Sequence, residues 1–174
     1  MGFFRKFKKT VSPEHRPGLN VCLLQRRLER YSTARLNAAM QSAWQRAHEP
    51  GRFFATNIND EHGLIKFESM FIPIYFHDRS LGDEELDGIE LPEWALHTAF
   101  CRISFSPGGE GLPTKQSRHQ FTGFVALLAL ELANENTGAF FFVEDQAFIA
   151  ASSLTRAMIL ERPTFDPHSA AVEQ

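Results

Sequence analysis

The sequence predicts a single α+β domain, with a split βαβ (ferredoxin-like) βαββαβ core that carries an extra strand and a C-terminal helix. Three observations predict it. The 174 residues fit one domain of ordinary size. Segments with strand and helix patterns alternate along the chain, and no internal repeat divides it. We expect a flexible basic arm at 1–18, the domain at 19–162 and a loose tail at 163–174.

The first strand and the first helix have the clearest patterns. Residues 19–24 (LNVCLL) form a continuous apolar run after a Pro-Gly pair, which is typical of a buried central strand. A helix is predicted next, with Ser32 or Thr33 as its N-cap and a stop at residues 49–51. Its apolar stripe recurs every three or four residues and consists of Leu36, Ala39, Met40, Ala43, Trp44 and Ala47.

A β-hairpin is predicted after this helix. Residues 52–58 (RFFATNI) are a strand candidate, and the polar residues 59–63 form a turn. Residues 64–76 (LIKFESMFIPIYF) are rich in β-branched and aromatic side chains, as strands are. Because Pro73 cannot donate to a ladder, we expect its part of the strand at an edge, a bulge or a break.

An acidic stretch separates the hairpin from the next strand. Residues 82–93 contain six acidic residues and no basic one. Pro92 is followed by EWALHTAF, which predicts a short helix or helical turn. A strand over 98–105 (TAFCRISF) comes next. The role of the acidic stretch does not follow from the sequence.

The C-terminal part begins with a loop at 107–113 that is rich in Gly and Pro and is expected to be flexible. A nearly fully buried helix is predicted over 118–134, capped by Ser117, with a stripe that consists of Phe121, Phe124, Val125, Leu128 and Leu132. The elements expected after it are the strand 139–143 (AFFFV), a turn at Glu144 and Asp145, the segment 146–150, and a last helix to Leu160 capped by Ser152 or Ser153.

The composition indicates where the aromatic side chains lie and in which cell compartment the protein is expected. Seventeen Phe stand against two Tyr and two Trp, so most of the aromatic surface has no polar group and belongs in cores or hydrophobic interfaces. Cys22 and Cys101 both lie in apolar runs, and we interpret them as buried thiols in a reducing compartment. No secretory signal and no apolar run of membrane-spanning length is visible, so a cytoplasmic location is expected.

Charge is distributed unevenly along the chain. Residues 1–52 hold 11 Lys and Arg against three acids, whereas the remainder holds seven against 18. The two halves are expected to neutralise each other within the domain, and a basic patch for an anionic partner is the alternative. The arginines are interpreted as a solvated helix face, not as a specific nucleic-acid site: Arg26, Arg27, Arg30, Arg35 and Arg46. An amphipathic pattern of the kind that contacts membranes lies at Phe3, Phe4, Arg5, Lys6, Phe7, Lys8 and Lys9.

Common catalytic motifs are absent from the sequence. It contains no G-x-G-x-x-G, P-loop, G-x-S-x-G or H-E-x-x-H motif, and no cysteine pair at zinc spacing. We therefore expect no cofactor and no metal. Glu93 and His97 would share one face of the predicted short helix, where they would suit acid–base or metal chemistry. The ordinary alternatives are a surface ion pair, or a histidine that fills a junction between helix and strand.

Four segments of the chain carry a family pattern: LNVCLL at 19–24, LNAAMQSAW at 36–44, WALHTAFCRISF at 94–105, and FTGFVALLALELANENTGAFFFVEDQAFIA at 121–150. Together they resemble the bacterial domain-of-unknown-function family 4261 over about residues 19–155. That pattern has an apolar first strand, a helix ending near a Trp, and a helix leading to a strand with an acidic turn. The resemblance implies no activity and no catalytic residues. The Phe-rich strand at 140–142 and the acidic insert at 82–93 depart from it.

The surplus of Phe and the missing catalytic motifs predict a non-enzymatic protein-interaction domain that binds a protein partner, or a second copy of itself through a sheet edge or face. One alternative is a small-ligand enzyme or hydrolase with a site near Glu93, His97 and the 107–113 loop. Another is association of the basic arm with anionic membranes or nucleic acid.

Overall fold

The computed structural model describes residues 19–67, 70–105 and 115–160. Its strands are β1 (Leu19–Gln25), β2 (Phe53–Asn57), β3 (His62–Phe67), β4 (Met70–His77), β5 (Ala99–Phe105), β6 (Thr137–Phe142) and β7 (Ala147–Ala150). Its helices are α1 (Thr33–Trp44), α2 (Asp83–Leu86), the 3₁₀ turn η1 (Glu93–Ala95), α3 (Lys115–Leu132) and α4 (Arg156–Leu160). The predicted arm at 1–18, the loop at 107–113 and the tail at 163–174 lie outside the described residues.

All seven strands belong to one antiparallel sheet, in the order β2-β3-β4-β5-β1-β6-β7. The α+β class is therefore confirmed, and β1 is a buried central strand between β5 and β6, as the sequence predicts. The finer prediction of a split βαβ (ferredoxin-like) core with one extra strand is not supported, because the sheet has seven strands.

Much of the difference arises in residues 64–76, which the sequence presents as one strand. The structure divides this region into β3 and β4, which pair with each other so that Ile65 faces Ile72. The predicted hairpin partner β2 does pair with β3. Pro73 lies opposite Leu64 of β3, and pairing of β4 with β5 starts only at Ile74. Pro73, which has no N–H to donate, therefore lies where β4 is paired with β3 but not yet with β5.

The helices begin and end at positions that differ from the prediction. Ser32 is the N-cap of α1, as expected, and its hydroxyl accepts a hydrogen bond from Arg35 N at 3.2 Å. However, α1 ends at Trp44, because Gln45 takes a left-handed conformation with φ 48°. Helix α3 begins at Lys115 instead of following Ser117, and α4 begins only at Arg156. On α3, Phe124 is exposed to solvent although it belongs to the predicted stripe.

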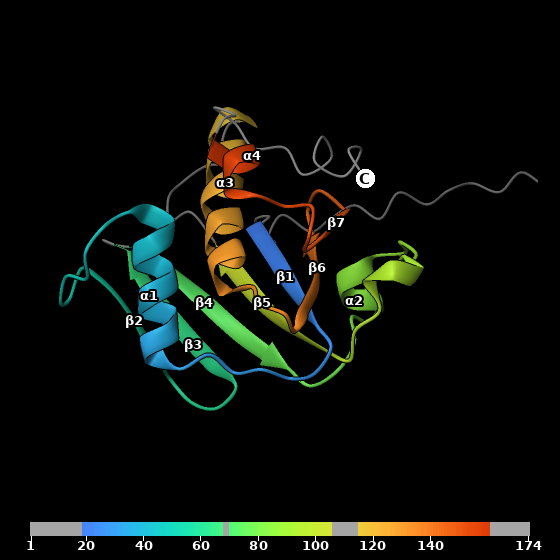
Figure 1. Ribbon diagram of the computed structural model, residues 1–174, viewed down its shortest axis with the longest axis horizontal. Helices are drawn as coiled ribbons and strands as arrows, with labels where there is room; N and C mark the ends of the chain where they lie inside the picture. The colour runs from blue at the N-terminus through green and yellow to red at the C-terminus, as the bar shows by residue number, and fades with distance from the viewer. Residues whose placement is uncertain (1–18, 68–69, 106–114, 161–174) are drawn as a thin grey trace, which may run out of the picture.

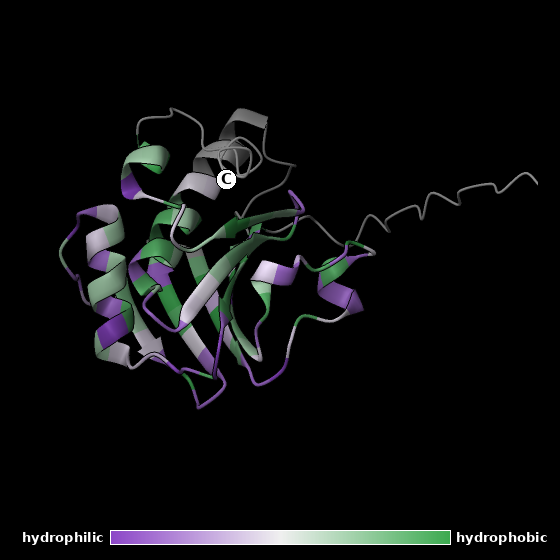
Figure 2. Ribbon diagram, turned by 45° about the vertical axis from the view of Figure 1, so that its right-hand side comes forward, coloured by the Kyte–Doolittle hydropathy of each residue, from purple (hydrophilic) through white to green (hydrophobic). Residues whose placement is uncertain are grey.

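Helices α1 and α3 cover one face of the sheet (Figure 1). Their buried side chains pack on alternate residues of the strands, among them Leu23, Ile74 and Phe140. The approach is close at Gly63 of β3, where an added Cβ would lie 2.9 Å from the Leu36 side chain. Figure 2 shows the hydrophobic residues concentrated in the central strands. No helix of the described part has the length and apolar character needed to cross a bilayer.

The two cysteines lie on neighbouring strands but on opposite faces of the sheet. Cys101 belongs to the core under α1 and α3, whereas Cys22 belongs to the apolar cluster on the other face. Both are free and buried, which confirms the prediction of buried thiols. Burial raises the pKa of each thiol, so neither is a ready nucleophile.

Helix α1 closes the outer edge of β2 with side chains that replace a neighbouring strand. The Asn37 amide donates to Ala55 O and accepts from Ala55 N, both at 2.9 Å. The Thr33 hydroxyl accepts from Asn57 N at 3.1 Å, and Glu49 forms a backbone bridge with Phe53. An exposed edge is a template for pairing with another chain, so this capping opposes self-association through β2.

Replacement of Asn37 by Ala tests this role of the amide. We expect N37A to lower the free energy of unfolding by about 1–2 kcal/mol, because two backbone groups lose their partner. The opened edge should also give concentration-dependent association. Urea unfolding and sedimentation velocity measure the two effects. Ser42→Ala on the same helix is the control, and an N37A protein that matched it in both measurements would contradict the proposed capping.

Candidate functional site

The chain between β4 and β5 covers part of the second face of the sheet, on the side away from α1 and α3. Leu81 and Ala95 from this segment are buried there against β-strand residues Cys22, Phe100 and Phe141. Leu86, Ile89 and Leu91 pack against the same cluster. The acidic stretch therefore has a structural role that the sequence did not reveal. It also contains the short helix α2, whose first turn holds Asp83, Glu84 and Glu85, where the helix dipole favours negative charge.

His97 holds the two ends of this segment together. Its Nε2 accepts a hydrogen bond from Leu81 N at 2.9 Å, so its Nδ1 carries the proton and donates to Ala95 O, also at 2.9 Å. The Ser80 hydroxyl donates to His97 O at 2.7 Å. Burial lowers the pKa of the His97 imidazole, which favours this neutral form.

Glu85 forms a second polar anchor. Its carboxylate accepts from Arg79 Nη2 at 2.7 Å, from Arg79 Nη1 at 3.1 Å and from Gly82 N at 2.8 Å. Burial alone would raise the pKa of Glu85, but the hydrogen bonds from Arg79 and Gly82 outweigh it and hold the pKa below its ordinary value. The Arg79 guanidinium also lies 5.1 Å from the centre of the Phe100 ring. We call Arg79, Glu85 and His97 the polar clamp.

The clamped segment presents two large apolar side chains to solvent. Trp94 is 50% exposed and Leu96 is 73% exposed. The other large hydrophobic side chains that are exposed in the described part lie farther apart along the chain, at Ile58, Phe71, Phe124 and Leu160. Single exposed apolar residues are normal on a protein surface, whereas a pair on one short turn marks a candidate contact site.

Acidic side chains are frequent in the residues that lead up to this pair. All five are exposed, and none forms an ion pair with a described residue: Asp83, Glu84, Asp87, Glu90 and Glu93. We refer to Trp94, Leu96 and these five carboxylates as the Trp94–Leu96 surface. This surface therefore combines two exposed apolar side chains with five exposed negative charges.

The helical turn predicted after Pro92 forms as η1, but it is too short for the predicted pairing of Glu93 with His97, which needs helix over 92–98. Only Glu93–Ala95 make a 3₁₀ turn, and Leu96 already has extended angles (φ −61°, ψ 131°). The two residues are therefore not one helical turn apart. Glu93 is exposed, whereas His97 is buried and both of its ring nitrogens are hydrogen-bonded to backbone atoms. Among the described residues, no other titratable side chain is hydrogen-bonded to the His97 ring.

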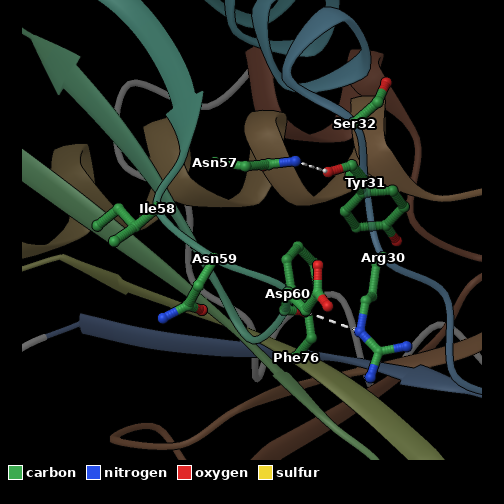
Figure 3. Close-up of a pocket in the computed structure, with 8 residues that line it drawn as sticks. All are labelled: Arg30, Tyr31, Ser32, Asn57, Ile58, Asn59, Asp60 and Phe76. Carbon is green, nitrogen blue, oxygen red and sulfur yellow. Dashed lines mark hydrogen bonds between the residues drawn. The ribbon is translucent and has the colours of Figure 1, made fainter.

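Two hollows lie at the end of the sheet near the β2–β3 turn. One of about 290 Å³ is lined by residues from the β1–α1 loop and the turn (Figure 3). Its polar groups bind one another, since Arg30 Nε donates to Asp60 O at 2.7 Å and Asn57 Nδ2 donates to Tyr31 O at 3.1 Å. The other, of about 250 Å³, is lined by Glu61, His62, Tyr75, Phe76, His77, Asp78 and Arg79. In this second hollow the His62 and Tyr75 rings meet edge to face with centroids 5.1 Å apart, and the His77 ring lies 6.4 Å from that of Tyr75.

Other charged residues singled out in the sequence lie in loops and turns. Glu144 accepts hydrogen bonds from both the backbone and the side chain of Asn20, which joins β1 to the turn after β6. Arg26, Arg27 and Arg30 lie in the β1–α1 loop, so they do not form a helix face as predicted. Among the described residues, no group of three or more His, Cys, Asp and Glu side chains has a metal-site arrangement.

Comparisons of this chain with protein-family models, with curated proteins and with solved structures give no match. The resemblance to family 4261 therefore stays a prediction.

The buried imidazole of His97 makes stability depend on pH. Its folded pKa is below the ordinary value of 6.5, so the unfolded chain binds more protons in acid. The stabilisation is complete above about pH 7 and is lost as pH falls below 6.5, with a slope of at most about 1.4 kcal/mol per pH unit for one group. His77, whose pKa burial also lowers, adds to the same trend.

His97→Gln retains an oxygen that can accept from Leu81 N but removes the titration. We expect urea unfolding of H97Q to show a shallower pH dependence between pH 7 and 5.2 than the unchanged chain. This range stays above the ordinary pKa of Glu85, which contributes only as pH falls below 4.5. An equal slope in both proteins would show that His97 does not titrate on unfolding.

Proposed function

We propose that this chain is a cytoplasmic, non-enzymatic protein-interaction domain that binds its partner through the Trp94–Leu96 surface. The observation that carries the proposal is the exposure of Trp94 and Leu96 on a turn whose flanks are held by buried hydrogen bonds. Trp is among the residues that contribute most to binding at protein interfaces.

The polar clamp favours binding because it fixes the backbone on which the two side chains stand. Glu85 and His97 are buried and bonded on both sides of η1, so little backbone freedom remains to be lost when a partner docks. Pre-organisation of this kind raises affinity by reducing the entropic cost of association.

The charges define the partner that fits. A protein that docks on Trp94 and Leu96 brings its own surface close to five carboxylates, so acidic residues there would be repelled and basic residues attracted. We therefore propose a partner segment that combines apolar side chains with Lys or Arg.

The alternative functions have less support. A hydrolase or small-ligand enzyme near Glu93 and His97 would need an imidazole with a free nitrogen, and both nitrogens of His97 are engaged with backbone atoms. Self-association through a sheet edge is opposed at β2 by Asn37 and Thr33. Membrane or nucleic-acid contact through residues 3–9 depends on a segment outside the described residues. Membership of family 4261 would be compatible with the proposal, since the resemblance implies no activity.

Site-specific photocross-linking in the source cell tests the proposal. A photoreactive phenylalanine analogue at position 94 or 96 should give one dominant cross-linked protein. The same analogue at Ile58, which is 61% exposed on the β2–β3 turn, should not. Truncation in the double variant W94A/L96A should weaken binding of the identified partner by about tenfold or more, as loss of a central Trp does at other interfaces.

The control is I58A, which removes an equally exposed apolar side chain from the other turn. Thermal unfolding of both variants should stay close to that of the unchanged chain, because half of the Trp94 surface and most of the Leu96 and Ile58 surfaces lie in solvent. If positions 94 and 96 cross-link no more than position 58, the Trp94–Leu96 surface is not the contact site.

A further inference from the structure

The N-terminal sequence of this chain has the chemistry that the Trp94–Leu96 surface calls for. Residues 3–9 (FFRKFKK) combine Phe3, Phe4 and Phe7 with four basic residues and contain no acid. We propose that this segment occupies the Trp94–Leu96 surface of its own chain and competes with the external partner. The inference rests on the proposed function, and it adds a regulatory element to the same site.

Complementary charge is the first argument. The surface presents five exposed carboxylates that have no ion-pair partner among the described residues. The segment carries Arg5, Lys6, Lys8 and Lys9 within five positions. Individual exposed pairs contribute little, about 0.2–1 kcal/mol each, but several arranged around an apolar contact add up. The uneven charge of the chain is thereby neutralised between its N-terminus and its acidic stretch.

Complementary apolar area is the second argument. Trp94 and Leu96 are largely exposed, and the three Phe of the segment have no polar group that favours water. Contact between them removes apolar surface from water on both sides, which is favourable at about 25 cal/mol per Å². The alternation of aromatic and basic residues in the segment also allows its cations to approach the Trp94 ring.

The length of the connection permits docking within one chain. Strand β1 starts at Leu19, and Thr98, just after the turn, donates its N–H to Gln25 O at the far end of that strand. Seven residues of strand cover roughly 20 Å. The ten residues from Lys9 to Leu19 reach up to about 33–36 Å when extended. The segment can therefore return along the sheet to the Trp94–Leu96 surface without help from a second copy.

Fluorescence of Trp94 in the full chain tests the inference. The W94F variant supplies the background from Trp44, which packs against Phe53 and Phe67. We expect the Trp94 signal of the unchanged chain to be partly protected from quenching by acrylamide. Charge reversal in R5E/K6E/K8E/K9E should weaken docking by about tenfold or more and raise the quenching constant. The variant R35E/R52E reverses exposed charges on α1 and just before β2, away from the Trp94–Leu96 surface, and should leave quenching unchanged.

Three further readouts decide between occupants. Added salt should raise quenching of the unchanged chain toward that of the fourfold variant, because it screens the charges. Cross-linking of the external partner at position 94 should increase in the fourfold variant. Equal quenching in the unchanged and fourfold chains would overturn the inference while leaving the partner cross-link, and so the proposed function, intact. Protection that rises with protein concentration would also overturn it, because the occupant would then be a second copy.

Discussion

The whole arrangement depends on the need to bury β1 from both sides. Val21 and Leu23 point to the core under α1 and α3, whereas Cys22 and Leu24 point to the opposite face, and all four are at most 1% exposed. The two long helices cover only the first face. The second face is therefore covered in part by the chain between β4 and β5, whose apolar residues alternate with acidic ones and whose helices are no longer than one turn. Helices this short are not stable by themselves. The hydrogen bonds that Glu85 accepts, and those that the His97 ring makes, therefore add to the stability that packing provides.

The parts of the fold that the sequence predicts are those determined by neighbouring residues. The apolar run at 19–24 identifies a strand buried on both faces, and the stripe from Leu36 to Ala43 with its Ser32 cap identifies α1. The division of residues 64–76 into β3 and β4 is different, because only Glu68 and Ser69 interrupt the pattern, and Ser favours turns more weakly than Gly, Pro, Asn or Asp. The predicted number of strands was too low for that reason, and also because residues 146–150 were not predicted to be a strand, whereas Ala147–Ala150 form β7 beside β6. The resemblance to family 4261, which rests on apolar motifs, did not indicate the number of strands either.

The candidate site was less accessible to sequence reasoning. Glu93 and His97 were grouped because they are four residues apart, yet the chain turns to extended geometry at Leu96 and separates their environments. The partners of His97 are backbone atoms of Leu81 and Ala95, and those of Glu85 are Arg79 and Gly82. Backbone partners leave no sequence signature. The spacing of Arg79 and Glu85 in an otherwise acidic stretch was the one available signal, since Arg79 is the last basic residue before it.

Two parts of the sheet are closed to a binding partner: the outer edge of β2 and the face under α1 and α3. Pairing at β2 is opposed by Asn37 and Thr33, and the face under α1 and α3 is filled. The chain between β4 and β5, by contrast, buries Leu81, Ala95 and His97 and leaves half of Trp94 and most of Leu96 exposed. Stability and recognition are thus divided between neighbouring residues of one turn. Because the clamp does not involve the exposed side chains, they can be chosen for a partner without cost to the fold, and this separation is the physical reason to look for function at the turn.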